Sequence, residues 1–267
     1  MTHIVCLSGG HSSGIAAIET VRRYGKENTI LLNHDLCARS EPEDIKRFKH
    51  DIANYLGLEI TFANMPHCDE KDQFDVCMER HAFKYGIQSS ALCTRVLKTE
   101  PFYSWLAENF PASKENLCTD ATVIYGFDPK EVNRINRRTE LMAAMGYTTE
   151  YPLCWEQRSI TNTEEIGIVR PASYEIFNHA NCIGCLKAGK QHWYIVFCLF
   201  PHAWEKAKYA EAQIGHSILK QAFLKDLEAE FGQLRAMGLP ATEKIPSQTF
   251  WAQARKLLKE ANNETSG

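Results

Sequence analysis

The chain has 267 residues, of which 44% are hydrophobic and 10% aromatic, enough for one large core or a core with a smaller appended unit. Its formal net charge of −3 excludes a polybasic protein, so any contact with nucleic acid would need a local patch. No stretch reaches the roughly 20 apolar residues of a membrane span, and the N-terminus lacks the features of a signal peptide. We therefore expect a cytoplasmic protein without membrane contact, whose ten cysteines are thiols or metal ligands rather than disulfides.

Short apolar runs alternate with helical patterns in the first half of the chain. The runs are typical of strands buried on both faces of a parallel sheet and cover residues 3–8, 29–35, 59–64 and 121–127. A helical pattern after the first run ends at Gly25, and Ser40 is placed to cap a second helix that ends at Gly57. This alternation predicts an α/β fold with a doubly wound, mostly parallel sheet.

The character of the sequence changes beyond residue 170. A loop with cysteines is followed by helical patterns, among them an apolar stripe of Leu224, Leu227, Phe231 and Leu234. We therefore expect an α/β domain over residues 1–170. Residues 171–267 are expected to form a cysteine-containing loop and a helical C-terminal extension packed on that domain.

The stretch "VCLSGGHSSG", residues 5–14, joins the first predicted strand to the first predicted helix. A strand that turns directly into a helix points backbone N–H groups at one spot, where the helix dipole adds positive potential. Glycines permit the tight turn, and serine hydroxyls add donors. The stretch predicts an anion-binding loop made of Ser8, Gly9, Gly10, His11, Ser12 and Ser13; an ordinary glycine turn is the alternative.

The same loop resembles the S-G-G-x-[DST]-S pyrophosphate loop of the N-type ATP pyrophosphatases. This superfamily of PP-loop, or adenine nucleotide alpha hydrolase, proteins includes phosphoadenosine phosphosulfate reductases, thiouridine synthases and DNA phosphorothioation enzymes. Further segments that resemble the reductase-like branch follow in the family's order, at residues 33–48, 92–102 and 125–138. The sequence departs from the family at His11, and at Phe127 and Asp128, where an arginine is usual.

The resemblance implies a Rossmann-like fold that binds ATP with Mg²⁺. It places the nucleotide at the loop and at Asn33, Asp35 and Gly126. The cationic side chains that it implies for the phosphates are Lys98, Arg95, Arg134 and Arg138. Arg134 and Arg138 share one face of a helix, where Glu131 can pair with either, and a solvated basic face is the alternative for these arginines.

The cysteine pattern indicates a metal site. Cys182 and Cys185 have the C-x2-C spacing that binds zinc or an iron–sulfur cluster. The resemblance adds Cys93 as a cluster ligand, and Cys198 is the natural fourth, although a buried structural thiol is equally compatible with its apolar surroundings. We expect a 4Fe-4S cluster. Zinc is the alternative, because His179 and His192 flank the pair.

The resemblance implies an ATP-dependent, adenylating and pyrophosphate-releasing sulfurtransferase that needs a sulfur donor or reductant. Nucleic acid is one acceptor it allows: Trp193 and Trp204 follow the C-x2-C among lysines, where they either stack on bases or belong to the core. The alternatives are a sulfonucleotide reductase and a nucleotide-binding regulatory protein with structural zinc. The reductases use a C-terminal cysteine, whereas the last cysteine here is Cys198. A homodimer is left open.

Overall fold

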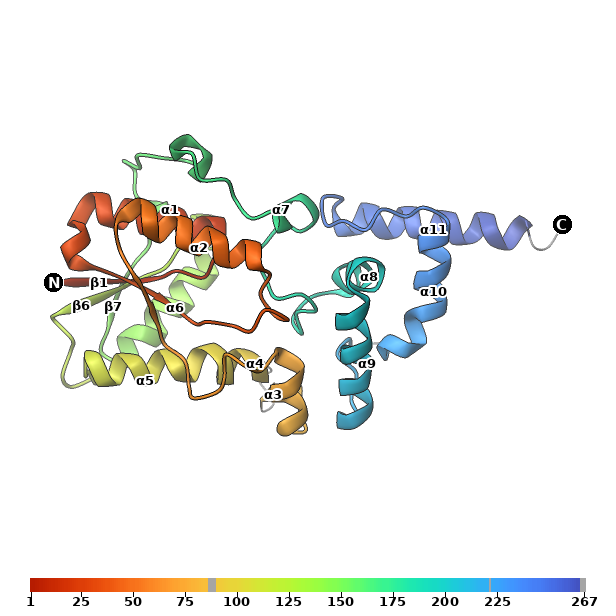
Figure 1. Ribbon diagram of the computed structural model, residues 1–267, viewed down its shortest axis with the longest axis horizontal. Coiled ribbons are helices and arrows are strands. Elements are labelled where there is room, and N and C mark those ends of the chain that lie inside the picture. Colours follow the sequence, from red (N-terminus) through yellow and green to blue (C-terminus); the bar gives the residue numbers. More distant parts are fainter. Residues whose placement is uncertain (86–89, 221, 265–267) are drawn as a thin grey trace. The chain divides into compact units, whose positions relative to one another are not determined.

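The computed structural model describes residues 1–85, 90–220 and 222–264, which fall into two compact units (Figure 1). The α/β unit comprises residues 1–36, 43–69 and 97–172. The helical unit comprises residues 37–42 and 70–96 together with residues from 173 to the C-terminus. The predicted boundary after residue 170 lies two residues from the observed one, but the helical unit also takes two segments from the first half of the chain.

The α/β unit contains a parallel sheet in which β1 is central. Its strand order is β3 (Ile60–Phe62), β2 (Thr29–Asn33), β1 (Thr2–Cys6), β6 (Ala121–Ile124) and β7 (Thr148–Glu150). Helices flank this sheet, which confirms the predicted doubly wound α/β fold class. β7 was not predicted, because its sequence Thr-Thr-Glu is polar and too short to show a pattern.

Helices cover both faces of the sheet (Figure 1). On one face, α1 (His11–Tyr24) and α2 (Glu43–Leu56) bury a cluster that includes Val5, Ile18 and Phe48. On the other, α5 (Glu100–Asn109) and α6 (Val132–Ala144) contribute to a cluster around Val123 and Met142. Burial on two faces explains why the strands read as continuous apolar runs.

The helix α2 begins later than the sequence predicts, so the expectation that Ser40 caps it is wrong. The first helical residue is Glu43, directly after Pro42. Ser40 is instead buried in the helical unit, where its hydroxyl donates to Oε1 of Gln73 over 2.7 Å. Pro42 sets the start of the helix, because its ring suits the entry to a helix and not the interior.

The helical unit is built around the apolar faces of its longer helices. These are α8 (Lys190–Leu199), α9 (Pro201–Ile214), α10 (Leu224–Ala236) and α11 (Ser247–Glu264), with the shorter α3 (Gln73–Glu79), α4 (Leu92–Thr94), α7 (Ser173–Ile176) and the strand pair β4 (Lys84–Tyr85) and β5 (Ser90–Ala91). The predicted stripe on α10 is buried in full.

Trp193 and Trp204 lie in the core of the helical unit. Their exposed fractions are 0% and 2%, and Trp204 packs against Phe231 with ring centroids 5.8 Å apart. Buried rings cannot stack on a base. Trp193 and Trp204 are therefore core residues, which was one of their two predicted roles. No helix of the described residues is long and apolar enough to cross a membrane.

Candidate functional site

The loop between β1 and α1 has the backbone of an anion-binding turn. Gly9 has a φ of +78°, in the left-handed region that favours glycine, and a Cβ there would lie 2.5 Å from Cγ2 of Ile45. Gly10 is the N-cap of α1, and no side chain caps that helix. Ser13 shapes the loop, because its hydroxyl donates to the carbonyl of Gly10 over 2.7 Å and accepts from the N–H of Ser8 over 3.2 Å.

The loop presents backbone donors at the positive end of α1. Across the described residues, the N–H groups of Gly9, Gly10 and Ser12 donate no hydrogen bond. Donors at a helix N-terminus stabilise a bound anion, since the helix dipole adds to their partial charges. The geometry of the loop therefore suits a phosphate group.

The loop lies at the topological switch point of the sheet. From β1 the chain proceeds to β2 and β3 on one side, and later to β6 and β7 on the other. Gly126, just after β6, approaches the first turn of α1 so closely that a Cβ would lie 2.6 Å from the carbonyl oxygen of Ser12. Switch points are where open α/β sheets bind ligands. The absence of a side chain at Gly126 therefore permits the close contact between the end of β6 and the first turn of α1.

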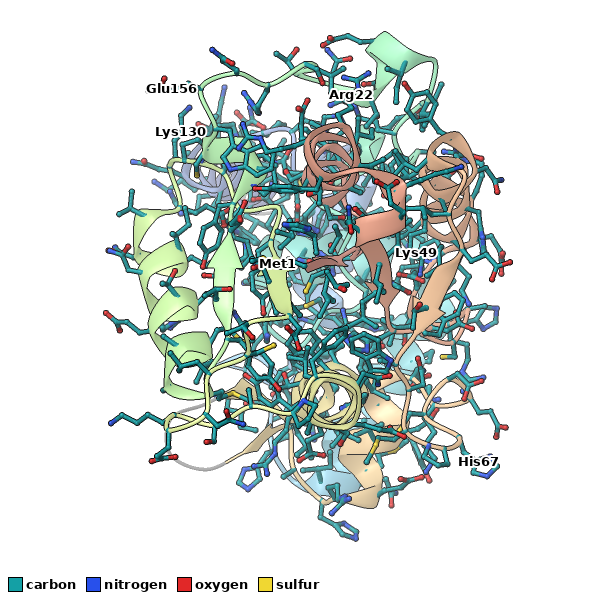
Figure 2. All side chains as sticks on the ribbon, turned by 90° about the vertical axis from the view of Figure 1, so that its left-hand side faces the viewer. Met1, Arg22, Lys49, His67, Lys130 and Glu156 are labelled. Carbon is teal, nitrogen blue, oxygen red and sulfur yellow. The ribbon has the colours of Figure 1, made fainter. Side chains whose placement is uncertain are left out.

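A buried lysine that the sequence did not reveal lies beside the loop. Lys49 of α2 is labelled in Figure 2. Its side chain is 1% exposed, and its Nζ donates to Oδ1 of Asn33 over 2.9 Å. A Cβ on Gly9 would lie 3.3 Å from the aliphatic stem of Lys49. Asn33 also donates to the carbonyl of Leu7. Asn33 therefore links β2 to the loop and to a buried cation.

His34 provides a neutral imidazole at the carboxyl end of β2. Its Nδ1 lies 2.6 Å from the carbonyl oxygen of Ala63, which can only accept, so Nδ1 carries the proton and Nε2 is an acceptor. The pKa of His34 is lowered to about 4, mainly by burial and to a smaller extent by the charges of Lys98 and Lys49, while the hydrogen bond to Ala63 opposes them. This effect of Lys98 places its ammonium group near His34, at the predicted end of the sheet.

Asp35 is held by its neighbours in the α/β unit. Asn64 accepts from the N–H of Asp35 and donates to its carbonyl, each over 2.8 Å. The carboxylate of Asp35 lies 2.8 Å from Nζ of Lys46 and is partly exposed. Its orientation at the end of β2 suits a contact with a ribose hydroxyl or with Mg²⁺, and Lys46 would compete with the ion.

The ring of His11 contacts the 3-10 turn that begins at Thr163. Its Nε2 accepts from the N–H of Thr163 over 3.2 Å, at the start of the 3-10 turn Thr163–Ile166. Burial lowers the pKa of His11, as does the charge of Arg170, whereas Glu164 opposes them. The ring is therefore neutral at pH 7, and Nε2 is used to join the loop to residues 163–166.

Lys98 and Arg95 lie in a π-helical turn. The chain in this region forms α4, a π turn over Arg95–Thr99 and α5. π turns inside α-helices are frequent at functional sites. Lys98 belongs to the α/β unit and Arg95 to the helical unit.

The arginines of α6 lie over aromatic rings that follow β6. The guanidinium of Arg134 is 4.0 Å from the ring centroid of Phe127, and that of Arg138 is 5.1 Å from Tyr125. Arg134 also pairs with Glu131 over 2.6 Å, as the sequence predicts. The Arg134 guanidinium therefore lies over the ring of Phe127, while the Arg134 side chain is 57% exposed.

The predicted metal ligands Cys93, Cys182 and Cys185 all belong to the helical unit. Gly184 between the last two has a φ of +69° and approaches Phe74 and Trp193. Gln73 of α3 donates to the carbonyl of Ile183 over 2.6 Å, which holds the C-x2-C loop against α3.

A zinc ion and an iron–sulfur cluster require different distances between the sulfur atoms of their ligands. Thiolates that share one zinc ion lie about 3.8 Å apart, from Zn–S bonds of about 2.3 Å in a tetrahedron. In the part of the chain that the structure describes, Cys93, Cys182 and Cys185 do not form a group with all sulfur atoms within 4.8 Å of one another. A four-iron cluster binds each thiolate to a separate iron, so its thiolates need not lie this close together.

Cys77 is a ligand candidate that the sequence left unassigned. It lies on α3, is fully buried, and shares a hydrogen bond with Cys93 that, together with burial, raises the pKa of Cys77 far above its ordinary value. Cys198, the predicted fourth ligand, instead shares a hydrogen bond with Tyr194 on α8. The spacing of Cys77 in the sequence shows no motif, so only the fold brings it to Cys93.

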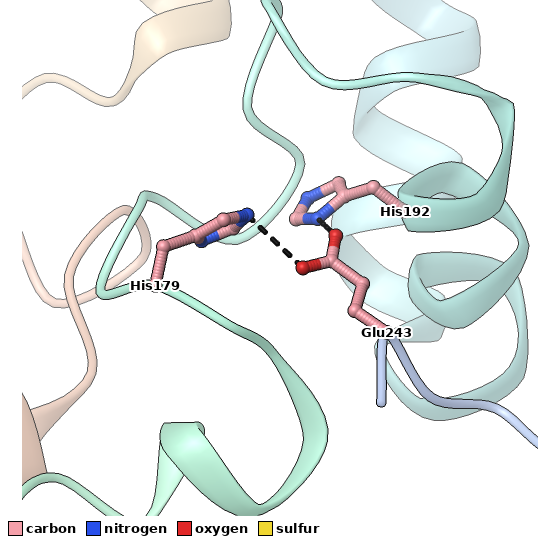
Figure 3. Close-up of side chains that lie close together, drawn as sticks. All are labelled: His179, His192 and Glu243. Atoms are coloured by element: carbon pink, nitrogen blue, oxygen red, sulfur yellow. Dashed lines mark hydrogen bonds and ion pairs between the residues drawn. The ribbon is translucent and has the colours of Figure 1, made fainter. Parts of the chain in front are cut away.

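His179, His192 and Glu243 form a compact trio (Figure 3), which we call the Glu243 clamp. Nε2 of His179 and Nδ1 of His192 each lie 3.2 Å from a different oxygen of the carboxylate. Burial alone would raise the pKa of Glu243, but the hydrogen bonds from both rings outweigh burial and hold this pKa far below its usual range.

The opposite nitrogens of both rings accept from the C-x2-C loop. The N–H of Asn181 donates to Nδ1 of His179 over 3.3 Å, and the N–H of Cys185 donates to Nε2 of His192 over 3.4 Å. Each ring therefore carries its proton on the side of Glu243. A metal ion bound by Nε2 of His179 and Nδ1 of His192 would shift the proton of each ring to its other nitrogen, which faces a backbone N–H group. The arrangement therefore favours hydrogen bonds that hold the loop over a His-His-Glu zinc site.

Comparison of the chain with protein-family models, with curated proteins and with solved structures finds no match. The functional assignment therefore depends on the chain's own residues and their geometry.

Proposed function

We propose that the protein is an ATP-dependent adenylating enzyme that transfers sulfur to an acceptor. The observation that carries this proposal is the row of unused N–H groups of Gly9, Gly10 and Ser12 at the N-terminus of α1, at the switch point of the sheet. The resemblance of this loop and of three later segments to the PP-loop family supports ATP as the nucleotide.

In the first step an oxygen of the acceptor attacks the α-phosphorus of ATP. A bond forms between that oxygen and phosphorus, the bond from phosphorus to the β-phosphate oxygen breaks, and pyrophosphate leaves. The loop N–H groups stabilise the charge that develops on the phosphates, and the buried ammonium of Lys49 adds positive potential beside them. Lys98 supplies a further cation near the end of β2.

In the second step a sulfur nucleophile at the oxidation level of sulfide displaces AMP. The bond to sulfur forms as the bond to the activated oxygen breaks, and AMP keeps that oxygen, so no net oxidation occurs. A bound cluster would supply the sulfur at this step. Cys93, Cys182 and Cys185, with Cys77 beside Cys93, are the residues that would hold it.

Four of the thiols are unsuited to act as the nucleophile of a sulfonucleotide reductase. Burial raises the pKa of Cys6, Cys154 and Cys198. A hydrogen bond with Cys93, together with burial, raises the pKa of Cys77. Attack on a sulfate sulfur needs a cysteine with a lowered pKa, because the thiolate is the nucleophile.

The variant Gly10→Val tests the nucleotide site. Gly10 has a φ of −81° and a ψ of 149°, which valine adopts readily, so the fold is retained while the side chain occupies the helix N-terminus. We expect ATP affinity by calorimetry to fall at least about tenfold and pyrophosphate release to be lost.

The matched control is Gly232→Ala in α10, where a Cβ meets open space. This variant should bind ATP as the unchanged protein does. Equal ATP affinity in Gly10→Val and the unchanged protein would refute the loop as the phosphate site.

A further inference from the structure

The helical unit contains a cavity of about 470 Å³. We call it the lysine cavity, because Lys84, Lys187, Lys190 and Lys220 line it and its described lining includes no acidic residue. The volume is within the range of small-molecule binding sites, about 300–1,000 Å³.

The charge of the lysine cavity is only partly neutralised. Nζ of Lys190 lies 2.8 Å from Oε1 of Glu230. Lys84, Lys187 and Lys220 are exposed, and within the described residues none of them forms an ion pair. The cavity therefore keeps a net positive charge that an anionic ligand would complement.

The positive end of α8 adds to this charge. Ala188, Gly189 and Lys190 line the cavity, and Gly189 is the N-cap of this helix of 10 residues, with no side chain capping it. A helix dipole favours negative charge at its N-terminus.

The inner wall of the lysine cavity is apolar. Phe83, Ile218 and Leu227 line it, each 7% exposed, together with Leu186. Inorganic phosphate alone would leave this wall uncovered, and a fatty acyl chain would use only one of the cations. A ligand with repeated phosphates and a flat, largely apolar base satisfies both parts of the cavity.

The cavity directly follows the C-x2-C loop in the chain. Residues 186–190 belong to its lining, and the N–H of Ala188 donates to the carbonyl of Cys185 over 2.9 Å. A ligand in the cavity would therefore lie next to the residues proposed to hold the sulfur source.

We propose that the lysine cavity binds the acceptor of sulfur transfer, and that this acceptor is a single-stranded segment of nucleic acid. Its phosphates contact the lysines and one unstacked base lies on the apolar wall. This inference rests on the proposed function for the role of the ligand as acceptor, whereas the binding itself does not require ATP.

The test is fluorescence anisotropy of the full chain with labelled single-stranded RNA and DNA of about 12 nucleotides, without ATP. We expect the double variant Lys84→Glu, Lys187→Glu to bind at least about tenfold more weakly. The slope of log affinity against log salt concentration should become shallower by about 1.4, because each of the two lost phosphate contacts contributes about 0.7. The control Lys256→Glu, on α11 with its side chain 78% exposed, should leave both values nearly unchanged. An oligomer with abasic sites should bind the unchanged protein more weakly.

Equal affinity in the double variant and the control would overturn the proposal, as would lysine-dependent binding of AMP or inorganic phosphate without binding of the oligomers. Gly10→Val separates the two proposals. It should lose ATP binding and still bind the oligomers. If it binds the oligomers normally but also binds and cleaves ATP as the unchanged protein does, the nucleotide site of the proposed function is refuted and the cavity assignment stands.

Discussion

At the residue scale, His34 combines a buried imidazole with two neighbouring ammonium groups. Its proton lies on Nδ1, which leaves Nε2 as an acceptor beside Lys98 at the end of β2. A neutral acceptor at this position can take a hydrogen bond from a ribose hydroxyl or from the amino group of adenine. The sequence shows His34 only as a residue between Asn33 and Asp35, since burial and the bond to Ala63 arise in the fold.

The lowered pKa of His34 predicts a loss of stability in acid. The unfolded chain takes up a proton as the pH falls through about 6.5, whereas folded His34 does so only near 4. The free energy of unfolding should therefore decrease between these values, by at most about 3 kcal/mol from this residue.

Urea unfolding at several pH values checks this prediction. In His34→Gln the decrease between pH 6.5 and 4 should be smaller than in the unchanged protein. Identical pH profiles for the two proteins would show that His34 is not the titrating group.

At the element scale, the C-x2-C loop has no regular secondary structure and depends on elements around it. Gln73 of α3 holds Ile183, and the Glu243 clamp holds Asn181 and Cys185. The clamp joins α8 to residues just before α11, where Gln191 also donates to the carbonyl of Thr242 over 2.8 Å. The position of the cysteines is therefore set by three elements that are distant in sequence.

Replacing Glu243 with glutamine tests the clamp. A neutral amide offers one acceptor oxygen and turns an NH₂ group toward the second imidazole, so one ring loses its orientation and its hold on the loop. We expect Cys182 and Cys185 to react several-fold faster with iodoacetamide, as measured by mass spectrometry.

The matched control for the clamp is Glu260→Gln, an exposed position of α11. Its alkylation rates should match those of the unchanged protein. Unchanged rates in Glu243→Gln would show that the loop holds its position without the clamp.

At the scale of the whole molecule, the two proposed activities lie in different units. The ends of β1, β2 and β6 in the α/β unit form the proposed nucleotide site, while the helical unit contains the proposed ligand cysteines and the lysine cavity. The segment from residue 70 to 96 joins the helical unit and brings Cys77 and Cys93 with it.

Metal analysis of protein purified without oxygen tests this division. We expect about four irons and four sulfides per chain, which Cys185→Ala should lose. Cys118→Ala is the control in the α/β unit and should keep them. One zinc in place of iron, or metal retained in Cys185→Ala, would refute the cluster and its ligands.

The sequence by itself determined the fold class and the location of the glycine-containing loop between β1 and α1. Strands buried on both faces need continuous apolar residues, and a strand that ends in Ser-Gly-Gly before a helix indicates its turn locally. The tertiary structure decided what depends on distant residues: the burial of Lys49, the neutral state of His34, the contact of Cys77 with Cys93, and the Glu243 clamp. Such contacts leave no periodic pattern in the chain, because they join side chains that only packing brings together.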